Sequence, residues 1–226
     1  MIFEYNPVMS DLIKVFTHPL QVFSKFTEKP KILLPLIIIL LTTIAYSIIY
    51  TRLVFVPHRF EMYDKQDIPL AQVEKMEEAV QKGTIYILNV VASFIYVVLG
   101  LVSVTLFFYL FFPVLGHDVN FFKTLSIITH AALIRIPAFL LKTPLVIMKG
   151  NEAVYTGLGI FFTSLGENNF LFKFFARFDL FTCWEVILIG LGMSVISRLT
   201  RKTTLIIAIV AWIAVNLILS LVPIGR

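Results

Sequence analysis

The chain has 226 residues, of which 58% are hydrophobic and 15% are charged, and its mean hydropathy is +0.90. In a soluble domain about a quarter of the residues are charged, and long apolar runs are absent. The composition therefore excludes a soluble protein and predicts an integral membrane protein. The formal charge of +5 does not predict nucleic-acid binding, because the Lys and Arg residues mainly flank apolar runs. The single cysteine, Cys183, excludes an intrachain disulfide, and no cleaved signal peptide is predicted at the amino terminus.

Residues 1–31 form the first predicted domain, a cytoplasmic segment at the membrane surface. Apolar residues recur near helical spacing across residues 10–26 with polar residues between them. This pattern predicts one or two amphipathic helices that lie on the inner membrane face, with lysines toward anionic headgroups. Pro19 suits the first turn of a helix better than its interior, so we expect a new helix to begin there.

Residues 32–226 form the second predicted domain, which contains five membrane-spanning helices. The first span runs from residue 32 to about residue 56 and follows a cluster of lysines, so the amino terminus should be cytoplasmic. A hydrophilic segment at 57–83, expected outside, contains an exposed helix near residues 70–82.

Two local interpretations concern this hydrophilic segment. Asp67 can cap the exposed helix, which is entered through Pro69. His58, Glu61 and Asp64 are residue types that bind metals, but their spacing matches no established ligand motif. We therefore predict no metal site and no cofactor for this chain.

The second and third predicted spans cover residues 84–114 and 121 to about 148. The third span is unusual because it carries His130 and Arg135, followed by Pro137. An ionised Arg near the bilayer centre is costly unless it is paired or hydrated, and such residues mark functional sites by default. Pro137 removes a backbone donor, so a kink is expected beside Arg135.

The fourth predicted span begins at Asp179 and ends at Arg198, and the fifth covers residues 205–222. Before them lies an outer segment, residues 149–178, whose Phe-rich end at 170–178 predicts a second interfacial helix. The basic flanks place the amino terminus in the cytoplasm and the carboxyl terminus outside. The predicted fold class is all-α, a polytopic membrane protein with about five transmembrane helices and amphipathic interfacial helices.

The candidate site is a set of polar side chains inside the membrane, because no zinc helix, phosphate loop or nucleophile elbow is present and no enzyme is predicted. Its members are His130, Arg135, Glu185, Asp179, Asn89 and Asn216. An ion pair between Arg135 and Glu185 is expected if the third and fourth spans are neighbours. Such a pair either belongs to a path for protons, ions or headgroups, or fixes the register of two helices. Asn89 and Asn216 are expected to form interhelical hydrogen bonds.

Three blocks of the sequence resemble the Yip1 family in its short prokaryotic form. They are THPLQVFSKF at 17–26, LGHDVNFFKTLSI at 115–127, and FDLFTCW at 178–184, which continues through Gly190 and Gly192 to Ser197. The resemblance implies a multi-pass membrane protein with a cytoplasmic amino terminus. Eukaryotic members act in vesicle traffic with Rab-type GTPases, but no Asp-Leu-Tyr-Gly-Pro motif precedes the first span here, so Rab binding is not carried over. For prokaryotic members the resemblance implies no established reaction.

The missing catalytic motifs, the interfacial helices and the resemblance favour a non-enzymatic scaffold or adaptor of the Yip1 type that organises lipids or partner proteins. We expect it in the bacterial cytoplasmic (inner) membrane, with membrane lipids, other membrane proteins or a second copy of the chain as partners, and no nucleic acid. The alternative is a small transporter, channel or lipid scramblase that uses a polar layer around Arg135, Glu185 and His130. In that case the three side chains should face one water-accessible cavity.

Overall fold

The computed structural model describes residues 7–66, 68–150, 154–166 and 168–221, and within these ranges the chain is helical and has no strand. Hydrogen bonds inside a helix satisfy its backbone, which is why helices can cross hydrocarbon. Five helical runs are long and apolar enough to do so, namely Leu33–Lys65, Thr84–Val114, Phe121–Lys149, Leu180–Ser197 and Arg201–Leu221. The predicted all-α polytopic membrane fold with five spans is therefore confirmed.

Contacts divide the chain into two units, which are described separately. The first unit comprises Met1–Ile37, Leu101–Arg135 and Tyr155–Arg226, and the second comprises Ile38–Gly100 and Ile136–Val154.

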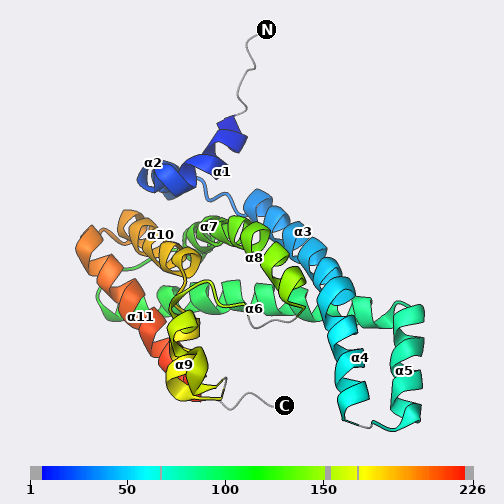
Figure 1. The fold of residues 1–226 in the computed structure, drawn as a ribbon. Helices are drawn as coiled ribbons and strands as arrows, with labels where there is room; N and C mark the ends of the chain where they lie inside the picture. The colour runs from blue at the N-terminus through cyan, green and yellow to red at the C-terminus, as the bar shows by residue number, and fades with distance from the viewer. Residues whose placement is uncertain (1–6, 67, 151–153, 167, 222–226) are drawn as a thin grey trace. The chain divides into compact units, whose positions relative to one another are not determined.

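The first unit is built around α10, Leu180–Ser197, which lies beside α11, Arg201–Leu221 (Figure 1). A Cβ atom built on Gly190 of α10 would lie 2.9 Å from the Cα of Leu205 on α11, so the glycine lets the two backbones approach closely. The opposite side of α10 packs against α7, Phe121–Ala131. This helix cluster holds most of the side chains that matter for the candidate site.

The amino-terminal segment folds as α1, Pro7–Thr17, and α2, Pro19–Ser24, so the second helix begins at Pro19 as predicted. The side chains of Val22, Phe23 and Phe26 are almost completely buried, and α2 packs against α10. The protein itself, rather than lipid, therefore covers this Phe-rich face. The physical reason lies in α10, because Gly192 leaves the room that Phe23 and Ile127 of α7 occupy. The position of the segment at the membrane surface stays a prediction.

A second aromatic cluster precedes α10. It consists of a 3-10 stretch, η4, Leu158–Leu165, and α9, Phe170–Ala176, which pack on one another. The rings of Phe162 and Phe175 stack with centroids 4.3 Å apart, and α9 also contacts α11. The predicted helix in residues 170–178 is thus present up to Ala176, and its place at an interface stays a prediction.

In the second unit, the first span continues beyond its expected end near residue 56. Helix α3, Leu33–Tyr50, is followed without a break by a π-helical turn, η2, Thr51–Phe55, and by α4, Val56–Lys65. Pro57 lacks the N–H group that would bond the carbonyl of residue 53 in an α-helix. The helix accommodates this with wider i→i+5 bonds, among them Val56 N–H to Thr51 O.

Helix α5, Leu70–Gln81, forms where an exposed helix was predicted, and it lies beside α4 as a hairpin (Figure 1). The two helices bury no residue. The predicted cap, Asp67, lies outside the described residues. Helix α6, Thr84–Val114, follows and extends from the second unit into the first.

The third span is interrupted close to the expected kink. Helix α7 ends at Ala131, a 3-10 turn, η3, covers Ala132–Ile134, and α8 runs over Arg135–Lys149. Pro137 cannot donate to the carbonyl of residue 133, so the α-helical ladder is broken at that turn. As a result Arg135 is the first residue of a new helix at the point where the ladder restarts.

Candidate functional site

Asp179 fixes the start of α10. Its Oδ1 atom accepts hydrogen bonds from the backbone N–H groups of Phe181 at 2.9 Å and Thr182 at 3.0 Å. A carboxylate in this position satisfies two donors that have no partner within the helix, and it interacts favourably with the positive end of the helix dipole. Asp179 was predicted to belong to the intramembrane polar site, and the structure gives it the role of an N-cap.

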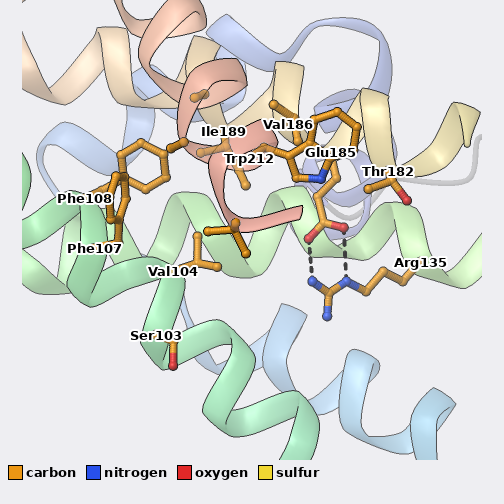
Figure 2. Close-up of a pocket in the computed structure, with 13 residues that line it drawn as sticks. Ser103, Val104, Phe107, Phe108, Arg135, Thr182, Glu185, Val186, Ile189 and Trp212 are labelled. Atoms are coloured by element: carbon orange, nitrogen blue, oxygen red, sulfur yellow. Dashed lines mark hydrogen bonds and ion pairs between the residues drawn. The ribbon is translucent and has the colours of Figure 1, made fainter. Parts of the chain in front are cut away.

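Arg135 and Glu185 form a two-pronged ion pair, which Figure 2 shows as two dashed lines. Nη2 of Arg135 donates to Oε1 of Glu185 at 2.7 Å, and Nε donates to Oε2 at 3.1 Å. This bidentate geometry matches the planar guanidinium to the planar carboxylate. The expected pairing of these two residues is confirmed, and it brings together two charges 50 positions apart in the sequence.

The ion pair lies at the wall of a pocket of about 320 Å³ (Figure 2). Helices α6, α10 and α11 supply the other walls. Apolar side chains make most of this lining, including Phe107, Phe108 and Ile189. The side chain of Glu185 is 13% exposed and that of Arg135 is 32% exposed, so the cation is the more accessible partner.

His130 is not brought to this pocket. Its ring is 2% exposed, and its Nδ1 atom lies 2.7 Å from the carbonyl oxygen of Ser126, one turn earlier on α7. Because a carbonyl only accepts, this geometry requires a proton on Nδ1. The ring also packs against Phe26, with centroids 4.4 Å apart. His130 therefore joins α7 to the amino-terminal segment and does not line the pocket of Arg135 and Glu185.

The two asparagines differ in their partners. Asn89 donates from Nδ2 to Oγ1 of Thr51 at 3.1 Å within the second unit, so its interhelical bond is confirmed. Asn216 donates to the carbonyl of Trp212 at 2.9 Å, one turn back in α11. Asn216 makes no interhelical hydrogen bond to the residues that the structure describes, so the prediction fails there, because the carbonyl at i−4 on its own helix lies within reach of the amide.

Sequence reasoning missed two features of the first unit. The walls of the pocket, such as Trp212 and Phe108, are ordinary residues of apolar helices, and no sequence signal distinguishes them from lipid-facing positions. The second feature is Asp11, whose buried carboxylate lies 2.5 Å from Nζ of Lys25 and 3.6 Å from Nζ of Lys31. Asp11 is the only acid between Glu4 and Glu28, and lysines follow it on the same segment, which is the signal that could have predicted this cluster.

The fold and the site together define a polytopic α-helical membrane protein with an ion pair and an apolar pocket inside one helix cluster. The family model of the Yip1 domain matches residues 13–222, which covers nearly the whole chain. The chain therefore belongs to the Yip1 family, as the three sequence blocks indicated. No curated protein and no solved structure matches the chain.

Proposed function

We propose that this protein is a non-enzymatic scaffold or adaptor of the bacterial cytoplasmic membrane that organises lipids or partner proteins. One observation carries the proposal, namely that the polar residues predicted to form one layer serve separate structural contacts. Asp179 caps α10, His130 bonds the carbonyl of Ser126, and Arg135 pairs with Glu185. A transport path needs polar groups that follow one another across the bilayer, whereas a scaffold needs polar contacts that hold helices in place.

The amino-terminal segment supplies a surface suited to such a role. Its apolar face is held against α10 and α7, and within the segment Asp11 pairs with Lys25 and Lys31. Its exposed residues include the polar Lys14 and Gln21 together with the apolar Ile13. The adaptor proposal assigns this exposed surface to the cytoplasm, on the side of the basic turn between α10 and α11.

Photo-crosslinking in cells tests the adaptor role. A photoreactive residue replaces Gln21, which is exposed on α2, and the matched control carries it at Glu77, which is exposed on α5. We expect reproducible protein adducts from position 21 that position 77 does not give. Adducts with lipid alone at position 21 would contradict the adaptor role.

Cysteine labelling tests the proposed orientation. In a Cys183→Ala background, a cysteine at Glu77 should react with a membrane-impermeant maleimide in intact cells. Cysteines at Gln21 and Thr200 should react only after the membrane is opened. Labelling at position 200 in intact cells would overturn the orientation.

The pocket at Arg135 and Glu185 is the observation that favours the alternative, a transporter, channel or scramblase. Reconstituted vesicles distinguish the two functions, with ion flux and lipid scrambling as the measurements. The scaffold proposal expects equal rates for vesicles with the wild type and for empty vesicles. Activity of the wild type that disappears in the double variant Arg135→Leu, Glu185→Leu would establish the alternative instead.

A further inference from the structure

The pocket changes in chemistry from one end to the other. Figure 2 shows Thr182, Glu185 and Arg135 at one side of it and Phe107 and Phe108 at the other. One side therefore offers a hydroxyl and two charges, and the other offers aromatic rings, with the hydroxyl of Ser103 one turn before Phe107 on α6. A pocket with this polarity fits an amphiphile better than a wholly polar or wholly apolar ligand.

The polar side lies nearer the Asp179 end of α10. Glu185 is six residues beyond the cap, or roughly 9 Å along the helix, and Ile189 is ten residues beyond it, or roughly 15 Å. Because α10 has 18 residues, or roughly 27 Å, Ile189 lies close to its middle. Along α10, the pocket thus runs from near the Asp179 end of the helix to its middle, which is the direction of a lipid chain that enters from that end.

Charge decides which headgroup suits the polar side. Arg135 is more exposed than Glu185, so a phosphate or ester oxygen meets a donor there. Glu185 balances the charge of Arg135, so the occupied site remains neutral only if the lipid itself carries no net charge. A net anionic lipid would leave an unbalanced negative charge in a medium of low dielectric, which is costly. A zwitterionic phospholipid meets both conditions.

The size of the pocket limits how much of the lipid it holds. Its volume of about 320 Å³ is at the small end of ligand pockets, which take roughly 300–1,000 Å³. One chain segment fits between Phe107, Phe108 and Ile189, and the rest of the molecule stays in the bilayer.

We propose that the pocket binds one zwitterionic phospholipid from the leaflet at the Asp179 end of α10, with its phosphate at Arg135 and one acyl chain toward Phe107 and Phe108. The inference rests on the proposed role in organising lipids and names the lipid class and the binding site.

Native mass spectrometry of the protein in detergent tests this proposal. The probes are dioctanoyl phosphatidylethanolamine, which is zwitterionic, and dioctanoyl phosphatidylglycerol, which is anionic. We expect one molecule of phosphatidylethanolamine to bind about tenfold more tightly than phosphatidylglycerol. Both lipids offer a phosphate to Arg135 for a charge-assisted contact, but only the zwitterionic one leaves the occupied site neutral. Equal binding of the two lipids would overturn the choice of headgroup.

Two variants on α11 locate the site. Ala211 lines the pocket, so Ala211→Phe should fill it and weaken binding about tenfold, on the scale of losing one buried contact. Ile218 lies on α11 at an exposed position and does not line the pocket, so Ile218→Phe is the matched control and should bind as the wild type does. Equal affinities of the wild type and Ala211→Phe would overturn the site.

The double variant Arg135→Leu, Glu185→Leu provides a second measure if Ala211→Phe does not fold. It keeps the apolar side of the pocket and should lose the preference for phosphatidylethanolamine over phosphatidylglycerol. Retention of the full preference would contradict a headgroup at Arg135. Crosslinking at Gln21 separates this inference from the adaptor role. If no lipid binds in the pocket but position 21 still gives protein adducts, the lipid site is contradicted and the adaptor role is not.

Discussion

The α4–α5 hairpin and the helix cluster around α10 contain ion pairs of nearly the same length in different surroundings. In the hairpin, Nζ of Lys65 lies 2.6 Å from Glu61, and Nζ of Lys82 lies 2.5 Å from Glu78. All four side chains are 59–69% exposed. Neither helix of the hairpin buries a residue, so water can solvate these charges with or without their partners.

In the helix cluster, the shorter bond between Arg135 and Glu185 is 2.7 Å, but Glu185 is only 13% exposed. When one partner of this pair is removed, little water can take its place beside the remaining charge. In an exposed pair, water hydrates the remaining charge. The surroundings of an ion pair, and not its bond length, therefore decide what it contributes to stability. Four predictions test this difference between the two regions.

The largest effect is expected at Arg135 and Glu185. Either Arg135→Leu or Glu185→Leu alone leaves an uncompensated, largely buried charge, which typically costs ~3–5 kcal/mol. The double substitution removes both charges and should restore most of the stability. Thermal unfolding of the three variants in one detergent measures this. Single variants as stable as the wild type would show that the pair behaves like an exposed one.

The next effect concerns how tightly each region is packed. Gly190→Ala places a Cβ atom 2.9 Å from the Cα of Leu205, so α10 and α11 must shift, at a cost of about 1–3 kcal/mol. Gly100→Ala in α6 meets nothing within 4 Å and is the matched control. Alanine favours a helix over glycine by up to about 1 kcal/mol, so the control should be neutral or stabilising. Equal melting temperatures for the two variants would contradict close packing of α10 on α11.

A smaller effect is expected at Asp11, whose carboxylate is buried but whose two lysine partners are half exposed. Asp11→Asn should cost about 1 kcal/mol, because the lysines can be rehydrated while the buried side chain loses charge-assisted bonds. Hydrogen exchange should become faster in α1 and α2 and stay unchanged in α11. The control is Glu28→Gln, because Glu28 is exposed. Unchanged exchange in α2 would show that its apolar contacts alone hold the segment.

The smallest effect is expected in the hairpin. Glu78→Gln removes one partner of an exposed i,i+4 pair, and such pairs contribute about 0.3–0.5 kcal/mol in general. We expect no measurable shift in the melting temperature, and high salt should not change this result. A shift as large as that of Glu185→Leu would remove the contrast between the two regions.

Much of the fold could be predicted because hydrophobicity and local caps act over short stretches of chain. The five spans follow from apolar runs, the start of α2 follows from Pro19, and the interruption of the third span follows from Pro137. The ion pair could also be predicted, because a charge inside a membrane helix needs a partner and few are available. The helix extension to Lys65 escaped prediction, since a π-turn accommodates Pro57 without ending the helix.

The five-span helical membrane fold follows from the amino-acid sequence, since transfer of each apolar run from water to lipid depends on that run alone. Which side chains meet depends on how the helices pack. This packing places His130 against Phe26, covers the face of α2 with α10, and assembles a pocket from four helices, α6, α8, α10 and α11. The reason is that the rotation and neighbours of each helix are set by close packing among residues far apart in the chain, such as Gly192 with Phe23.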